Sequence, residues 1–283
     1  MLRFTEMFNG AGFSVDVYGA RKYSTPFQEI MLLETEVFGK ILVLDGAVQT
    51  TDRDEFIYHE MIVHVPLFTL GRKPEKVLVI GGGDGGTVRE VLKHAPDHID
   101  MVEIDREVVE LCKKEFPEIS SGLSDERVSI YYEDGREFVK GKENEYDVIV
   151  VDCSDPAGPS AVLFSKEFYE DVKKALKDDG VFVTQSESPF AQKKEFVMVV
   201  SNLTKVFSTV RPYLAFIPSY PSGMWSFTFA SNGKDPLTIS PEELSERMKD
   251  VVRRTKKKFK YYNLEIHYGA FAIPNFVIDE FKK

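Results

Sequence analysis

Cysteine is scarce in this chain. Only two of its 283 residues are cysteines, Cys112 and Cys153, and they lie far apart without the spacing of metal ligands. A disulfide framework or a zinc site therefore has little support, and a reducing cytoplasm is the compartment that we expect. Glutamine and asparagine are also rare, with four and six residues, which weakly favours a heat-adapted source.

Long apolar runs and an excess of positive charge are absent as well. The N-terminal residues lack the apolar core of a signal peptide, and no later run approaches the ~18 apolar residues of a membrane span. The 46 acidic residues outnumber the 36 basic ones, and the formal net charge is -10. Because such a chain repels phosphate backbones and anionic lipid, we expect neither a nucleic acid nor a membrane as a partner. The basic run at 253–260 is interpreted as a solvated helix face.

The length and the 43% of hydrophobic residues fit a globular protein of about two domains. Glycine, proline and turn residues separate short strand-like runs in the first part of the chain, at 13–18, 28–34 and 40–44. They predict a small antiparallel β domain over residues 1–54. From residue 55 a helical pattern runs as far as Pro66.

Strands and helices then alternate. We expect the strands of this second part at 76–80, 98–104, 128–132, 147–151, 181–185, 211–216 and 225–230. The alternation predicts an α/β fold over residues 55–283, with an open, doubly wound and mostly parallel sheet that helices cover on both faces.

A glycine-rich loop, Gly81–Gly86 (GGGDGG), follows the first of these strands. It contains the G-x-G-x-x-G pattern between a strand and a helix, where glycines allow a tight turn and let a nucleotide approach the backbone. Glu103 ends the second strand, where a carboxylate can accept both ribose hydroxyls. The two features together indicate a ligand that contains adenosine.

Acidic residues follow four consecutive strands of the predicted sheet. They are Asp84, Glu103, Asp105, Asp134, Asp152 and Asp155. Because the carboxyl ends of parallel strands meet at one edge, we expect a strongly negative pocket there. Such a pocket disfavours the pyrophosphate of NAD or FAD and favours an adenosine ligand with positive charge, such as an S-adenosylmethionine-type sulfonium. Carboxylates also suit Mg²⁺, but no ligand spacing is present, so we expect no metal site.

At this point the chain resembles the spermidine synthases, which are polyamine aminopropyltransferases, from about Phe13 to Asn275. The segments that carry the resemblance are LDGAVQ (44–49), DEFIYHE (54–60), HVP (64–66), VLVIGGGDGGTVRE (77–90), VEID (102–105), DCSDP (152–156), GP (158–159) and YPSGMW (220–225). The resemblance implies a methyltransferase-like Rossmann domain behind an N-terminal β-strand domain that forms part of the active-site wall and assembles homodimers or homotetramers. It also implies aminopropyl transfer from decarboxylated S-adenosylmethionine, a co-substrate and not a resident cofactor, to a diamine such as putrescine.

The resemblance further implies the role of individual residues, with Asp152 as the proton acceptor. The residues expected to hold the methylthioadenosine part are Gln28, Glu103, Asp134, Gly135 and Pro159. Those expected near the aminopropyl group or the polyamine are His59 and Asp84. Those expected along the diamine tunnel are Gln49, Tyr58, Asp155, Tyr220 and Trp225, with Cys153 and Ser154 between the two aspartates; a serine is commoner at the position of Cys153. His64 is expected to be structural.

Several alternatives stay open at this point. Agmatine or another polyamine could replace putrescine as the main acceptor. An S-adenosylmethionine-dependent methyltransferase would share the sheet, the glycine loop and Glu103. A non-catalytic nucleotide-binding protein is the alternative from another class, but it would have no use for Asp152 and Asp155 beside aromatic residues.

Overall fold

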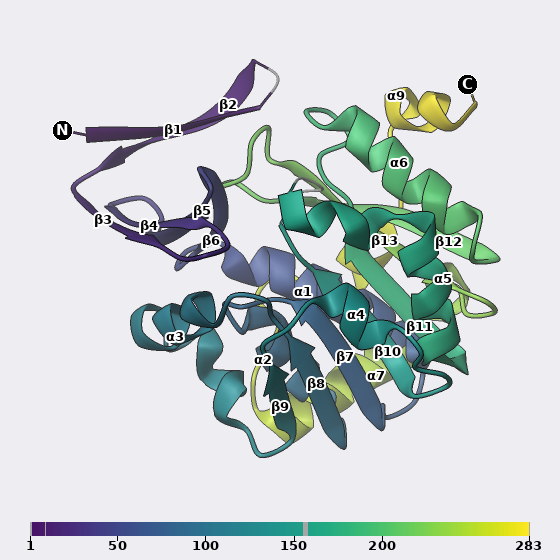
Figure 1. Cartoon of the computed structure of the whole chain (residues 1–283). Coiled ribbons are helices and arrows are strands. Elements are labelled where there is room, and N and C mark those ends of the chain that lie inside the picture. Colours follow the sequence, from purple (N-terminus) through teal and green to yellow (C-terminus); the bar gives the residue numbers. More distant parts are fainter. Residues whose placement is uncertain (1, 9, 155–157, 283) are drawn as a thin grey trace.

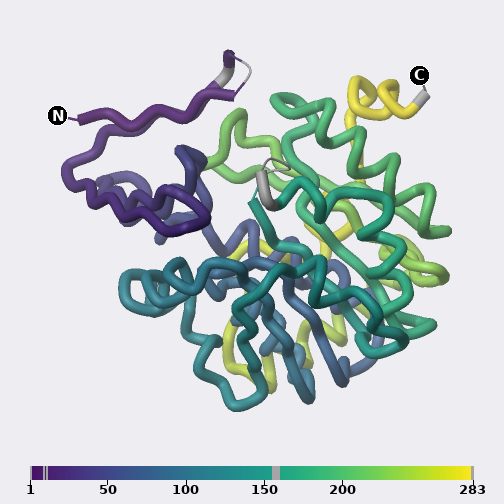
Figure 2. Tube along the Cα trace, in the orientation of Figure 1, coloured from purple at the N-terminus to yellow at the C-terminus, as the bar shows by residue number. Residues whose placement is uncertain are grey.

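The computed structural model describes residues 2–8, 10–154 and 158–282. In Figure 2 the chain runs from N-terminal strands on the left to the C-terminus at the upper right, with the larger α/β part between them. Among the described residues, no helix is long and apolar enough to cross a membrane.

Six strands form the N-terminal part, in two antiparallel sheets. β1 (Leu2–Phe8) pairs with β2 (Ala11–Val17) as a hairpin. The four-stranded sheet has the order β3-β4-β5-β6 and consists of β3 (Gly19–Ser24), β4 (Glu29–Thr35), β5 (Gly39–Leu44) and β6 (Ala47–Thr51). The antiparallel β unit is therefore confirmed. The sequence pattern identified β2, β4 and β5 and missed the other three strands.

Seven strands form the main sheet, in the order β12-β13-β11-β10-β7-β8-β9. Their bounds are β7 (Lys76–Gly81), β8 (His98–Val102), β9 (Val128–Tyr131), β10 (Tyr146–Asp152), β11 (Leu176–Gln185), β12 (Thr209–Phe216) and β13 (Met224–Ser231). β13 runs antiparallel to both of its neighbours, and the ladders from β11 through β9 are parallel. The expected mostly parallel sheet is confirmed.

Helices cover both faces of this sheet (Figure 1). One face packs its valines and phenylalanines against α1 (Glu55–Leu70), α2 (Gly86–Leu92) and α7 (Pro241–Thr255). The other face packs against α4 (Gly135–Val139), α5 (Lys166–Ala175) and α6 (Lys193–Thr204). Because successive strand residues point to opposite faces, both sides of the strands are apolar, as a doubly wound sheet requires.

The remaining helices are short or lie at the rim. They are α3 (Arg106–Glu115), α8 (Leu264–Gly269) and α9 (Asn275–Ile278), with the 3₁₀ turns η1 (Ser120–Ser124), η2 (Gly158–Phe164), η3 (Pro236–Thr238) and η4 (Asp279–Lys282).

The expectation that the first helix ends at Pro66 is wrong. α1 continues through Pro66 to Leu70 and ends at Gly71, whose φ of 84° gives a left-handed cap. The helix is buried on nearly all sides, so packing compensates for the hydrogen bond that proline removes.

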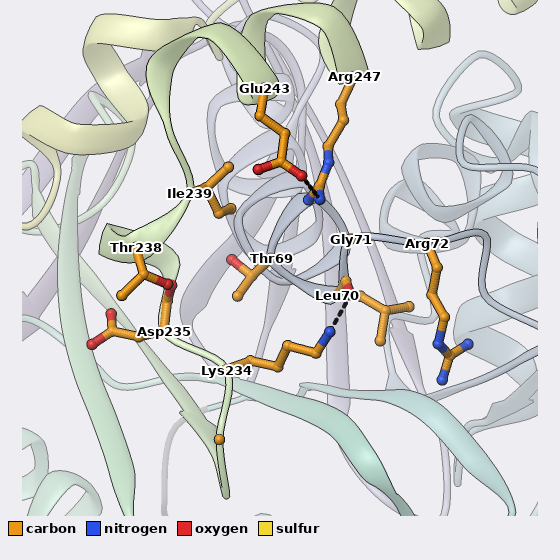
Figure 3. Close-up of a pocket in the computed structure, with 11 residues that line it drawn as sticks. Thr69, Leu70, Gly71, Arg72, Lys234, Asp235, Thr238, Ile239, Glu243 and Arg247 are labelled. Atoms are coloured by element: carbon orange, nitrogen blue, oxygen red, sulfur yellow. Dashed lines mark hydrogen bonds and ion pairs between the residues drawn. The ribbon is translucent and has the colours of Figure 1, made fainter.

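Side chains from the C-terminal part also stabilise the end of α1. Lys234 Nζ donates to the Leu70 carbonyl at 2.8 Å beside a cavity of about 290 Å³ (Figure 3). Arg247, which also lines this cavity, donates to the Phe68 carbonyl. The cationic side chains that line this cavity, Lys234, Arg247 and Arg72, therefore contact the end of α1 or nearby carboxylates.

The basic run at 253–260 is only partly helical. α7 ends at Thr255, and Lys256 follows in the left-handed region with a φ of 58°. Arg253 and Arg254 form exposed ion pairs with Asp250 on the same helix. The predicted solvated helix face therefore holds for 253–255 and not for the rest of the run.

Charged contacts hold the N-terminal sheet on α3. Arg21 and Lys40 contact the Glu115 carboxylate at 2.7 and 3.0 Å near the end of the helix. At its start, the buried Asp105 side chain accepts hydrogen bonds from Thr25 at 2.7 Å and from Gln28 at 2.8 Å. The N-terminal strands are thus fixed at both ends of the helix that follows β8, next to the sheet edge where the site lies.

Candidate active site

A cavity of about 520 Å³ lies between the N-terminal strands and the carboxyl ends of the parallel strands. The structure brings thirteen of the predicted site residues to its lining, namely Gln28, Gln49, Tyr58, His59, Asp84, Glu103, Asp134, Gly135, Asp152, Cys153, Ser154, Tyr220 and Trp225. Asp155 and the side chain of Pro159 lie outside the described part of the chain. Residues of β1, including Glu6, also line the cavity, although the sequence pattern predicted no strand at these positions.

Glycines shape the loop that forms the cavity floor. Gly81, Gly82 and Gly85 adopt φ values of 84°, 69° and 84°, which side chains rarely tolerate. A Cβ at Gly81 would overlap the backbone of Asp152, and one at Gly86 would overlap the His59 ring. The glycines therefore let the loop pack closely against β10 and α1.

Four adjacent strands end in acidic residues at this edge. β10, β7, β8 and β9 are neighbours in the sheet. Asp152 is the last residue of β10, and Asp84, Glu103 and Asp134 follow β7, β8 and β9 in that order. In the β10–β7 ladder Asp152 is the register partner of Gly81. The predicted row of carboxylates is thus present in the folded chain.

Glu103 directly follows β8 and lines the cavity. Burial raises the pKa of Glu103 to about 7, although the Asp105 backbone N–H, which donates to its Oε1 at 3.0 Å, opposes the rise. Asp105 also accepts from Gln28 Nε2, which leaves the Gln28 carbonyl oxygen as the side chain's acceptor. Glu103 and the Gln28 carbonyl oxygen together offer hydrogen-bond acceptors to the hydroxyl groups of a ligand.

Asp134 lies at the end of β9 and caps the next helix. Its Oδ1 accepts from the Arg136 backbone N–H at 2.8 Å at the start of α4, where Gly135 packs against Ile80.

Two hydroxyl groups hold the carboxylate of Asp152. Tyr58 donates to Oδ1 and Thr87 to Oδ2, each at 2.6 Å. Burial and the negative charge of Asp84 raise the pKa of Asp152, while His59 and these two hydroxyl groups oppose the rise. Asp152 is therefore a strong, oriented acceptor at the cavity wall.

Aromatic rings extend from Asp152 along the cavity. Tyr58 packs edge-on against Tyr220, whose hydroxyl donates to the Gln49 carbonyl at 2.6 Å. Trp225 packs edge-on against Tyr220 with ring centroids 4.7 Å apart, and its indole nitrogen has no hydrogen-bond partner among the described residues. This wall can contact methylene groups and cationic ends of a ligand.

Two histidines of α1 have different surroundings. His59 faces the cavity, with Nε2 at 3.3 Å from Asp84 and Nδ1 at 2.6 Å from Glu55. Burial alone would raise the pKa of Asp84, but His59 and the Gly86 backbone N–H lower it to about 2. His64 is buried against Glu90 and His94 and does not line the cavity, a position that agrees with the structural role expected for it.

Sequence reasoning missed several polar residues around the cavity. Gln185 donates to the Cys153 carbonyl at 3.3 Å and to Glu187 at 2.8 Å, and Gln192 also lines the cavity. The position of Gln185 at the end of β11, at the same sheet edge, is the signal that could have identified it, whereas Gln192 directly precedes α6 and carries no such signal. Thr87 directly follows the glycine loop, but a single threonine there carries no recognisable pattern.

Comparison with known proteins identifies a family. Residues 55–240 match the family model described as the spermine/spermidine synthase domain, and residues 4–52 match the spermidine synthase tetramerisation domain. A polyamine aminopropyltransferase of Caldicellulosiruptor bescii is 50% identical over 256 residues, which is 89% of this chain and 87% of that protein. One of Methanocaldococcus jannaschii is 48% identical over 260 residues, 91% of this chain and 86% of the other.

Solved structures share the whole architecture. Spermidine synthase from Thermotoga maritima is 42% identical with a TM-score of 0.91, covering 100% of this chain and 94% of that one. A spermidine synthase in complex with the transition-state analogue AdoDATO is also 42% identical, with a TM-score of 0.92 over 99% and 95% of the chains. The chain therefore belongs to the spermine/spermidine synthase family of enzymes, and the resemblance inferred from its motifs is confirmed.

Thr87→Val tests the hydroxyl contact to Asp152. The variant keeps the size of the side chain and removes the donor to Oδ2, so we expect the pKa of Asp152 to rise further and its carboxylate to protonate at higher pH. Carboxyl ¹³C NMR across a pH series measures this shift. Thr204→Val, which removes a distant hydroxyl bonded to the Val200 carbonyl, is the control. An unchanged Asp152 titration in Thr87→Val would contradict the assignment.

Proposed function

We propose that this enzyme transfers the aminopropyl group of decarboxylated S-adenosylmethionine to a diamine, with putrescine as the preferred acceptor and spermidine and methylthioadenosine as products. The observation that carries the proposal is Asp152, oriented by two hydroxyl groups, in the same cavity as Asp84 and Glu103 and beside an aromatic wall. This is a site for a cationic nucleoside and an amine together.

The nucleoside part of the donor fits the Glu103 side of the cavity. Glu103 and the Gln28 carbonyl oxygen would accept hydrogen bonds from the ribose hydroxyls, with Gln28 fixed by Asp105. Asp134, Gly135 and Pro159 would complete the methylthioadenosine site, a role that the family resemblance supports.

The cationic part of the donor would lie against Asp84. Decarboxylated S-adenosylmethionine carries a sulfonium and a terminal ammonium, and both charges are attracted to this end of the cavity. S-adenosylmethionine itself has an additional carboxylate, which Asp84 would repel. Asp84 therefore favours the decarboxylated donor. The ion pair with His59 would hold the Asp84 carboxylate in place.

The acceptor amine would attack the carbon next to the sulfonium. A new C–N bond forms, the C–S bond breaks, its electron pair remains on the sulfur of neutral methylthioadenosine, and the nitrogen loses a proton. An amine with a pKa of about 10.4 is uncharged in roughly one molecule in 10³ at pH 7, a cost of about 4 to 5 kcal/mol. Asp152, whose pKa is raised, would accept a hydrogen bond from the amine N–H and so orient the nitrogen lone pair. It would then take up the proton that the nitrogen loses, with Tyr58 beside it.

The rest of the acceptor would extend along the aromatic wall. Tyr220 and Trp225 would pack against its methylenes and cationic end, and Gln49 would border them. The family resemblance assigns Asp155, which lies outside the described residues, to anchoring the diamine beside Asp152. Cys153 and Ser154 would form the segment between the two aspartates. These groups recognise charge and methylenes without fixing the length of the acceptor.

We also propose that the chain consists of two domains with different roles, residues 1–54 and residues 55–283. The first would form part of the cavity wall and assemble homodimers or homotetramers, which its match to the tetramerisation model supports. The second would carry the chemistry.

A panel of amines tests the proposed reaction. We expect incubation with decarboxylated S-adenosylmethionine to add one aminopropyl group to putrescine, by mass spectrometry, and kcat/KM to be highest for putrescine among putrescine, cadaverine, agmatine and spermidine. Turnover with more than one amine is expected because the wall does not fix chain length. Agmatine as the best acceptor would replace putrescine in the proposal. Failure of every amine to gain the group would overturn the reaction itself.

Asp152→Asn tests the proton acceptor. We expect kcat to fall by at least about 10², the range for loss of a general base, while methylthioadenosine binds with nearly unchanged affinity because the shape is conserved. Steady-state kinetics and calorimetry measure the two quantities. Asp171→Asn, which neutralises a partly exposed carboxylate paired with Lys174 on α5, is the matched control and should keep parental turnover. Parental turnover in Asp152→Asn as well would remove Asp152 from the mechanism.

A further inference from the structure

A continuous chain of buried and partly buried charged side chains leads from the cavity into the contact between α1 and α2. Its members alternate in charge and are Asp84, His59, Glu55, Arg89 and Glu90. Arg89 contacts both oxygens of Glu55, with NH1 at 3.0 Å from Oε1 and NH2 at 2.8 Å from Oε2. Its Nε donates to Glu90 at 3.0 Å. The chain of contacts therefore reaches from a cavity residue to the interior.

The sequence positions these groups through the geometry of two helices. Glu55 and His59 are one helical turn apart, so they lie on the same face of α1. Gly86, at the start of α2, leaves room for the His59 ring, which any Cβ at that position would overlap. Arg89 follows on α2, and its side chain is only 14% exposed. Burial makes these ionic contacts much stronger than surface pairs.

The contacts of His59 determine its charge. A carboxylate oxygen faces each ring nitrogen, and a neutral imidazole has only one N–H to donate. The other nitrogen would then place its lone pair against a carboxylate. Both nitrogens therefore carry hydrogen. Burial alone would lower the pKa of His59, but Asp84 and Glu55 outweigh it and hold this pKa well above its usual value.

A cationic His59 affects both carboxylates of the proposed reaction. The charged groups around it are Glu55 on α1, Asp84 in the glycine loop, Arg89 on α2 and Asp152 on β10, with the Tyr58 ring in edge contact. Asp84 and Asp152 raise each other's cost of ionisation because they share one cavity. The positive charge of His59 opposes that repulsion for both.

We propose that Glu55 and Arg89 are positioning residues for aminopropyl transfer. The Glu55–Arg89 pair fixes His59 with a hydrogen on each ring nitrogen, which anchors Asp84 and lets Asp84 and Asp152 be negative together when the cationic donor binds. This assignment rests on the proposed function for its catalytic consequence, whereas the charge of His59 follows from the contacts alone.

The experiment compares the parent enzyme with Glu55→Gln by two readouts. NMR of ¹⁵N-labelled histidine rings, with the His59 signals identified by their loss in His59→Asn, reports its protonation between pH 6 and 8.5. We expect two N–H groups throughout that range in the parent and a neutral ring at the upper end in Glu55→Gln. We also expect the variant's kcat/KM relative to the parent to fall at least tenfold at pH 8 and to recover toward pH 6, where His59 regains its proton.

Two further variants keep the test interpretable. Arg89→Lys retains the charge but loses the bidentate contact with Glu55, so its kcat/KM should fall less, with the same pH dependence. This variant replaces Glu55→Gln in the test if Glu55→Gln does not fold. Glu246→Gln, which removes a carboxylate from an exposed ion pair on α7, should match the parent at every pH.

A neutral His59 in the parent would overturn the inference, as would a deficit in Glu55→Gln that does not change with pH. A parent enzyme that transfers no aminopropyl group to any amine would overturn the proposed function and the catalytic role assigned here. The NMR result would then still decide the charge of His59, so the two failures are distinguishable.

Discussion

The crowding of negative charge at the carboxyl ends of β10, β7, β8 and β9 is the constraint that organises this site. Each carboxylate there has a different compensation. His59 pairs with Asp84, two hydroxyl groups hold Asp152, and Asp134 caps a helix start. Glu103 has no such partner side chain among the described residues, and burial raises its pKa to about 7. A ligand with positive charge therefore completes the electrostatics of the cavity, whereas a pyrophosphate would increase the repulsion.

The N-terminal strands matter because the negative edge needs a cover. Arg21 and Lys40 attach them to the end of α3, and Asp105 attaches them to its start. The same Asp105 fixes Gln28 and donates its backbone N–H to Glu103, so the contact between the two parts of the chain also shapes the nucleoside end of the cavity. A cover lowers the contact of the site with solvent, and charge interactions are stronger where the surroundings are less polar than water.

Local sequence patterns predicted much of this fold and site, whereas the features that they missed depend on tertiary contacts. The glycine loop and the acids after successive strands predicted the sheet edge because both depend on neighbours in sequence. The end of α1 was mispredicted because burial overrides the local effect of Pro66. Arg89 and Gln185 were missed for a similar reason: their importance depends on Glu55 and Cys153, which are distant in sequence and become neighbours only in the fold.

Calorimetry on two donors tests most directly the claim that this charge arrangement selects the ligand. Decarboxylated S-adenosylmethionine and S-adenosylmethionine differ by one carboxylate, which the cavity would place near Asp84. We expect the decarboxylated compound to bind at least about tenfold more tightly, and Asp84→Asn to narrow this difference in affinity. Equal affinities in the parent protein would contradict the account and favour a methyltransferase.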